Sequence, residues 1–134
     1  VIPIVKKCLI NYTASFMCIT KDMSVGDLYK NYHKELENIF FESFDILSHF
    51  YPMILKFKSD IYDYVFYALK NIYNQHYSSA YVDIKNDKNI EFDTLNLALI
   101  KYSKKNNLKT PIYNNSLLED IYKKYPKYIK HDIK

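Results

Sequence analysis

The stretch IPIVKKCLINYTASFMCI, residues 2–19, decides the fold. It predicts one helix that is apolar on most sides, with Pro3 in the first turn, where a missing N–H costs nothing. Lys7, Asn11 and Ser15 interrupt the apolar surface at intervals of four residues. Because positions i, i+4 and i+8 follow one slowly drifting line along a helix, these polar side chains share a face. A buried helix carries such a line where something polar needs it, so this line is the strongest pointer to function.

The glycine content favours helices for the rest of the chain. Gly26 is the only glycine among the 134 residues, whereas β-rich folds need glycines in their turns. The same count excludes a nucleotide-binding loop of the G-x-G-x-x-G or Walker type within these residues. The composition therefore favours helices joined by Asn, Asp and Lys turns.

Hydrophobic spacing predicts an all-α bundle of five or six helices in one domain, residues 1–134. Gly26 is predicted to mark the break between the first two helices, Pro52 to end a helix and Asp60 to cap the next one. The predicted helices cover residues 2–19, 31–50, 61–74, 78–85, 91–105 and 116–125. The predicted core positions outside the first helix are Leu36, Ile39, Phe40, Phe44, Leu47, Ile61, Tyr64, Val65, Ala68, Leu69, Ile72, Phe92, Leu95, Leu99 and Tyr102.

The charged residues argue against nucleic acid as a partner. The net charge is only +4, and every basic residue outside the four histidines is a lysine. The densest basic stretch, residues 123–134, has no arginine fork for phosphates or base edges. It is typical of a solvated lysine tail.

The cysteines and the apolar runs predict a cytoplasmic protein. Cys8 and Cys18 lie about 15 Å apart along one predicted helix, which is too far for a disulfide, and unpaired cysteines suit a reducing compartment. No run reaches the roughly 20 apolar residues of a membrane span. The polar residues of the first helix also make it a poor signal peptide.

A second polar cluster occupies residues 78–96, SSAYVDIKNDKNIEFDTLN. Taken alone, it has a structural interpretation, because Ser78 or Ser79 can cap a helix and Glu91 suits the first turn of one. Lys7 has a similar alternative, since a lysine stem can extend from a buried helix and leave its amine in water.

Together, the two clusters resemble the C-terminal domain of ketopantoate reductases. Residues 7–11 (KCLIN) and 24–28 (SVGDL) align without gaps with that family's lysine, its asparagine four residues on and its Gly-Glu-Leu-like turn. Residues 78–83 and 90–96 are similar to the family's Ser-Ser-x-x-x-Asp and Thr-Glu-Ile-Asp-x-x-Asn stretches, and residues 109–111 to its proline turn. The resemblance implies the helical fold of the C-terminal domains of ketopantoate reductase and 6-phosphogluconate dehydrogenase-like proteins.

The resemblance implies an oxidoreductase that reduces 2-dehydropantoate, or a similar 2-oxo acid, to the 2-hydroxy acid with NADPH. Lys7 aligns with the catalytic lysine, which stabilises the developing alkoxide and donates a proton. Asn11 and Ser15 align with substrate-binding positions, and Ser79 aligns with the serine that contacts the substrate carboxylate. Glu91 aligns with the glutamate that binds the substrate hydroxyl and favours the charged lysine.

The family's cofactor domain is absent from these residues. NADPH is expected to bind mainly to an N-terminal Rossmann domain, supplied in cis or in trans, so the chain alone is expected to be inactive. A start at Val1 suggests a processed product or a piece of a longer polypeptide. A homodimer is compatible with this interpretation.

Three positions depart from the family pattern. Ser15 stands where these enzymes usually carry a second asparagine, which leaves the identity of the 2-oxo acid open. Val5 replaces a common tryptophan, and Leu97 replaces a glycine. Two alternatives therefore remain. One is a helical interaction module that binds a partner helix in an apolar groove, and the other is a pseudoenzyme that has lost cofactor binding.

Overall fold

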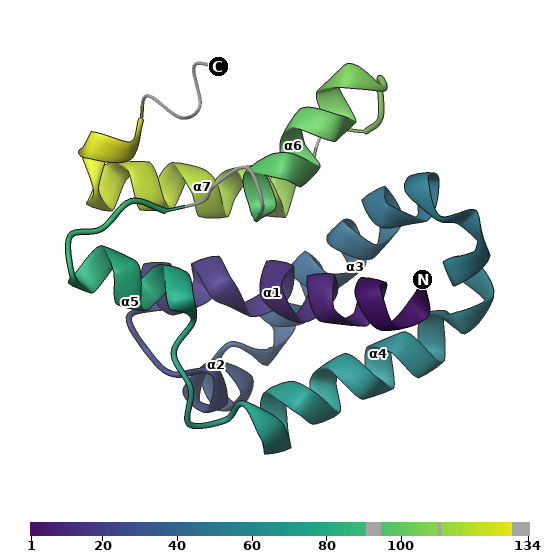
Figure 1. Ribbon diagram of the computed structural model, residues 1–134, viewed down its shortest axis with the longest axis horizontal. Helices are drawn as coiled ribbons and strands as arrows, with labels where there is room; N and C mark the ends of the chain where they lie inside the picture. The colour runs from purple at the N-terminus through teal and green to yellow at the C-terminus, as the bar shows by residue number, and fades with distance from the viewer. Residues whose placement is uncertain (91–94, 110, 130–134) are drawn as a thin grey trace.

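Helix α1 (Ile2–Lys21) runs through the centre of the computed structural model, which describes residues 1–90, 95–109 and 111–129 (Figure 1). Helices α6 and α7 lie on one side of α1, α4 lies on the opposite side, and α5 lies beside its C-terminal half (Figure 1). The all-α prediction is confirmed, and the described residues contain no strand. The remaining helices are α2 (Val25–Asn31), α3 (His33–Phe50), α4 (Lys58–Tyr67), α5 (Ser79–Lys85), α6 (Asn96–Lys105) and α7 (Ile112–Lys124).

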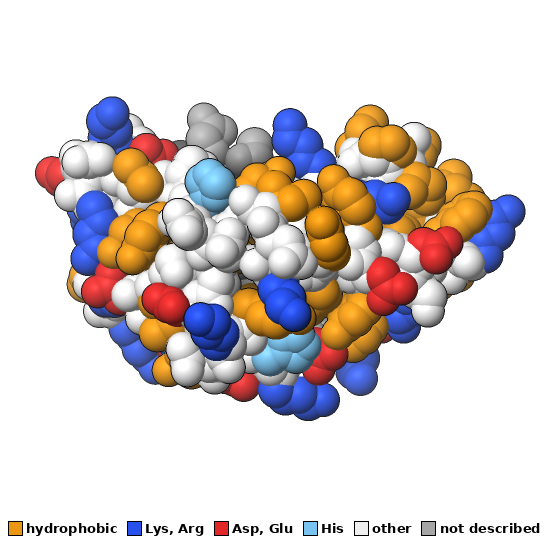
Figure 2. All heavy atoms as spheres, turned by 90° about the horizontal axis from the view of Figure 1, so that it is seen from below, with side chains coloured by type: hydrophobic (Ala, Val, Ile, Leu, Met, Phe, Trp, Pro, Cys, Tyr) orange, Lys and Arg blue, Asp and Glu red, His pale blue; other side chains and the backbone are white. Residues whose placement is uncertain are grey.

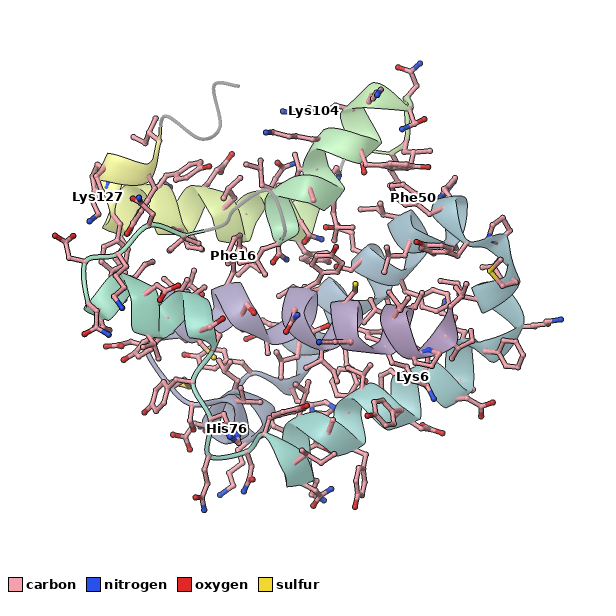
Figure 3. The ribbon with its side chains drawn as sticks, viewed as in Figure 1. Lys6, Phe16, Phe50, His76, Lys104 and Lys127 are labelled. Atoms are coloured by element: carbon pink, nitrogen blue, oxygen red, sulfur yellow. The ribbon has the colours of Figure 1, made fainter. Side chains whose placement is uncertain are left out.

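The core forms around α1 because its apolar residues point in nearly every direction. Its C-terminal half is buried almost continuously from Tyr12 to Ile19. Phe16, which has no exposed surface, lies between α1 and α7 (Figure 3). By length and composition α1 could cross a membrane, contrary to expectation, but here most of it is the central core helix. Cys8 and Cys18 are both free thiols, as their spacing predicted.

The predicted core of α3 is confirmed, and that of the next helix is confirmed in part. All five predicted α3 residues are buried, and so are Ile61, Val65, Ala68 and Leu69. Tyr64 and Ile72, in contrast, are exposed, so those two predictions were wrong. Farther along, Leu99 is buried and Leu95 and Tyr102 are half-buried, while Phe92 lies outside the described residues.

A wide turn explains why Ile72 faces solvent. After Tyr67 the helix continues as a π-helical turn, η2 (Ala68–Ile72), in which the Tyr73 N–H donates to the Ala68 carbonyl five residues earlier, at 2.8 Å. Such a turn adds one residue to the helical period, so the side chains that follow it rotate away from the predicted face.

Gly26 does not lie in a break between helices. It lies in the first turn of α2, a helix that hydrophobic spacing did not predict. Ser24 caps this helix, because its hydroxyl accepts the Asp27 N–H at 3.3 Å. The Gly26 N–H donates to the Asn74 carbonyl at 2.8 Å, and a Cβ at position 26 would lie 2.5 Å from that oxygen. The glycine is therefore required for a close backbone approach.

The predicted helix starts at residues 61 and 116 differ from the structure, and the predicted start at residue 91 lies outside the described residues. Pro52 ends α3 as predicted and opens a 3-10 turn, η1 (Pro52–Phe57), so α4 begins at Lys58, with Asp60 in its first turn instead of at the cap. Helix α7 begins at Ile112 instead of residue 116. It ends before Pro126, as predicted, and a short 3-10 turn, η4 (Pro126–Tyr128), follows.

A buried polar network joins four helices. The Asn96 side-chain amide donates to the Tyr12 carbonyl at 2.9 Å and to Oδ1 of Asn114 at 2.6 Å. The Asn114 amide donates in turn to Glu42 Oε1 at 2.8 Å and to the Ser43 hydroxyl at 3.3 Å. Buried polar groups need such partners, so the network holds α6 and α7 against α1 and α3.

Exposed hydrophobic side chains gather at the end of the molecule formed by η1 and the start of α1 (Figure 2). Charged side chains are spread over the rest of the face seen there. The exposed apolar residues at this end are Val1, Ile4, Met53, Leu55 and Phe57.

Candidate functional site

The polar line of α1 borders a single cavity of about 210 Å³. Lys7 and Asn11 are exposed, and Ser15 is 7% exposed, so the line descends from the surface into the protein. The cavity is smaller than the roughly 300–1,000 Å³ pockets of drug-sized ligands, which suits a small metabolite. The remaining lining residues are Ile10, Ala14, Val25, Leu69, Tyr73, His76, Tyr77 and Ser78.

The wall opposite Lys7 and Asn11 is the segment between η2 and α5, residues 73–78. Backbone hydrogen bonds fix this segment. The His76 N–H donates to the Tyr73 carbonyl, and the His76 carbonyl accepts the Val25 N–H, both at 2.9 Å. Figure 3 shows His76 on this segment, on the side of α1 away from α7.

Ser78 joins this wall to α1. Its hydroxyl donates to the Ser15 carbonyl at 3.0 Å and accepts the Tyr81 N–H at 3.1 Å, which makes Ser78 the N-cap of α5, one of the two predicted alternatives. Burial raises the pKa of the nearby Cys18 thiol, and hydrogen bonds with Ser78 partly offset that rise. Ser79, the predicted carboxylate contact, is the first residue of α5, is exposed and does not line the cavity.

The cavity has basic but no acidic side chains among its described lining residues, where Lys7 and His76 are the basic groups. Beside it, burial raises the pKa of the Cys8 thiol, although the charge of Lys7 opposes the rise. Lys6 has a different environment, since its amine lies 4.7 Å from the ring centre of Tyr64. The cavity, with Lys7 and His76 on its lining and no acidic side chain among its described lining residues, therefore suits a small anion.

The sequence missed the aromatic wall, Tyr73, His76 and Tyr77. Hydrophobic periodicity gives no information on an irregular segment, and only its position just before Ser78 and Ser79 could have drawn attention to it.

Glu91 lies outside the described residues, so its meeting with Lys7 stays a prediction. The structure does describe the start of α6 nearby. The Asn96 side-chain amide donates a hydrogen bond to the carbonyl of Tyr12, the residue after Asn11. This end of α6 therefore lies against the middle of α1.

A cavity bordered by Lys7 in an all-α domain is the arrangement that the sequence resemblance implies. In agreement, the family model described as ketopantoate reductase PanE/ApbA C terminal matches residues 3–123, which is most of the chain. The chain belongs to this family, and the resemblance drawn from its sequence is confirmed. No curated protein and no solved structure matches it.

The described residues do not fit a whole nicotinamide cofactor. The cavity of about 210 Å³ is small for a dinucleotide, and the chain has no glycine-rich loop to hold a pyrophosphate. No group of three or more His, Cys, Asp or Glu that could hold a metal ion occurs within the described ranges.

Proposed function

We propose that this chain is the substrate domain of an NADPH-dependent reductase that converts 2-dehydropantoate, or a similar 2-oxo acid, to the 2-hydroxy acid. The observation that carries the proposal is the position of Lys7, Asn11 and Ser15 along one cavity without an acidic group among its described lining residues. Family membership supports the same reaction class.

Lys7 is proposed as the catalytic residue. A ketone that is reduced develops negative charge on its oxygen, which an ammonium group within hydrogen-bonding distance can stabilise and then protonate. Lys7 is suited to this role because it stands at the exposed end of the polar line that borders the cavity. Lys6, whose amine lies over an aromatic ring, is not.

Asn11, Ser15 and Glu91 are proposed to bind the substrate. Asn11, one turn from Lys7, orients the substrate or the lysine, and Ser15 contacts the substrate deeper in the cavity. The family motif assigns the hydroxyl contact to Glu91 and the carboxylate contact to Ser79, which does not line the cavity.

The cofactor half of the active site is proposed to come from a Rossmann domain, in cis or in trans, because these residues do not fit a whole dinucleotide. The two free cysteines favour a cytoplasmic enzyme. A homodimer is the proposed assembly, and exposed apolar surface of the kind seen around η1 is common at protein contacts.

The test is reduction of a 2-oxo acid panel by the complete protein, including its cofactor domain, followed as NADPH oxidation. The panel contains 2-dehydropantoate, pyruvate, 3-methyl-2-oxobutanoate and phenylpyruvate. Saturable turnover with at least one acid is expected. Binding of an acid without turnover would identify a pseudoenzyme, and neither binding nor turnover would contradict the proposed function altogether.

A further inference from the structure

The carboxylate contact that the family motif assigns to Ser79 has no counterpart inside the cavity. Ser79 is exposed and is not a lining residue. The neighbouring Ser78 does line the cavity, but its hydroxyl already donates to the Ser15 carbonyl and accepts the Tyr81 N–H. Neither serine therefore presents a free donor to a ligand in the cavity.

His76 lies on the same wall and has the properties that such a contact needs. Its backbone N–H and carbonyl are both hydrogen-bonded, to Tyr73 and Val25, which fixes the position of the residue. Its ring packs edge-on against Tyr73, with centroids 5.6 Å apart, while the side chain stays exposed to an entering ligand. An imidazole has an N–H to donate in both of its protonation states.

The other donors of the cavity are less suited to the carboxylate. Lys7 is proposed to act at the ketone oxygen and Asn11 lies one turn from it, so both are needed at the reacting end. The Tyr77 ring is stacked on Tyr81 at 4.7 Å, which holds it beside α5. The Tyr73 ring supports the imidazole.

We propose that His76 binds the substrate carboxylate and so makes this site selective for 2-oxo acids over neutral ketones. The inference rests on the proposed function. It assigns Lys7 and His76, on the two walls of the cavity, to the opposite ends of one 2-oxo acid: the lysine to the ketone and the histidine to the carboxylate. His76 is then a substrate-binding residue that sets specificity, and the proton donor remains Lys7.

The test compares 3-methyl-2-oxobutanoate with its methyl ester, which has the same ketone and no negative charge. Steady-state kinetics of the complete protein are measured for His76→Phe, which keeps an aromatic ring without a donor, and for His76→Gln, which keeps a donor. Ser79→Ala tests the family assignment, and His49→Phe is the matched control, an exposed histidine on α3 outside this cavity.

We expect His76→Phe to raise the KM for the acid about tenfold or more with little change in kcat, as for loss of a hydrogen bond to a charged group. The KM for the ester should stay unchanged, His76→Gln should restore most of the affinity for the acid, and His49→Phe should have no effect. The inference would be overturned if His76→Phe left the KM for the acid unchanged or raised the KM for the ester equally. It would also be overturned if Ser79→Ala alone raised the KM for the acid without raising that for the ester.

Failure of the proposed function is a separate result. If the unaltered protein reduces none of the acids, the histidine ring signals are followed by NMR as 3-methyl-2-oxobutanoate is added to the same protein. A saturable shift of the His76 signal, absent with the ester, would still support carboxylate binding. No shift would overturn it.

Discussion

At the scale of single residues, two neighbouring lysines of α1 differ because they lie on different faces of the helix. Lys7 borders the cavity with Asn11 and Ser15, whereas the Lys6 amine lies over the Tyr64 ring. Helical spacing alone was sufficient to predict that Lys7, Asn11 and Ser15 share a face, since the period of a long helix fixes which side chains align.

Gly26 controls the approach of two backbone segments, and its substitution tests that geometry. Gly26→Ala would place a Cβ 2.5 Å from the Asn74 carbonyl oxygen, a backbone atom that cannot rotate away. We expect a loss of about 1–3 kcal/mol in the free energy of unfolding, measured by urea denaturation. Lys30→Ala, an exposed change on the same helix, should cost less than about 0.5 kcal/mol. Equal stability of Gly26→Ala and the unaltered protein would contradict the close approach.

At the scale of elements, the start of α7 shows what local sequence could not predict. Glu42 of α3 accepts the Tyr113 N–H at 3.0 Å and the Asn114 N–H at 2.8 Å. Backbone N–H groups in the first turn of a helix have no carbonyl partner within that helix, so here a carboxylate from another helix acts as their cap. The residues next to Pro111 carry no sign of this distant partner, which is why the predicted helix began too late.

Removal of this carboxylate should fray the start of α7. We expect Glu42→Ala to lower the free energy of unfolding by about 1–2 kcal/mol, the usual cost of a lost helix cap. Hydrogen exchange should accelerate at the amides of Tyr113 and Asn114. Glu119→Ala, an exposed change on α7 itself, is the control. Unaltered protection of both amides in Glu42→Ala would rule out the proposed capping.

Helix α5 is attached to the C-terminal end of α1 through Tyr81, whose hydroxyl donates to Asp22 Oδ1 at 2.6 Å. This hydrogen bond raises the pKa of Tyr81 to about 12 and, together with Lys85, lowers that of Asp22. Because an unfolded tyrosine has a pKa of about 10, the protonated hydroxyl stabilises the fold below pH 10. That contribution is lost as the pH rises from about 10 to about 12.

Tyr81→Phe should therefore lower the Tm by about 2–5 °C at pH 8. The difference from the unaltered protein should shrink as the pH rises above 10. Thermal unfolding followed by circular dichroism at pH 8 to 11 measures both effects, with Tyr67→Phe, an exposed tyrosine of α4, as control. A Tm difference that grows with pH would show that the hydrogen bond does not favour the protonated tyrosine.

At the scale of the whole molecule, the sequence predicted the class of fold and one wall of the site. Long apolar stretches with helical spacing were sufficient for α1, α3 and most of the core of α4, and the scarcity of glycine excluded the main alternatives. The other wall could not be predicted. Its position depends on a π-helical turn and on backbone contacts with α2, which are tertiary features without a local pattern.

Under the proposed function, catalysis is divided between these residues and a second domain. These residues offer a small basic cavity and no phosphate-binding loop, so they suit the substrate and not the cofactor. The proposed function therefore assigns the reductant to a second domain, and under it variants of the cavity should alter substrate kinetics without altering the affinity for NADPH.

Substitution of Lys7 in the complete protein tests the account most directly, with Lys6 as the matched control on the same helix. Lys7→Met should lower kcat by about 10²–10⁴-fold, the usual contribution of a general acid, and leave the Kd for NADPH within about twofold. Lys6→Met, which removes the contact between the amine and the Tyr64 ring, should keep nearly full activity. Turnover by Lys7→Met equal to that of Lys6→Met would contradict the catalytic role of Lys7 and the proposed function that depends on it.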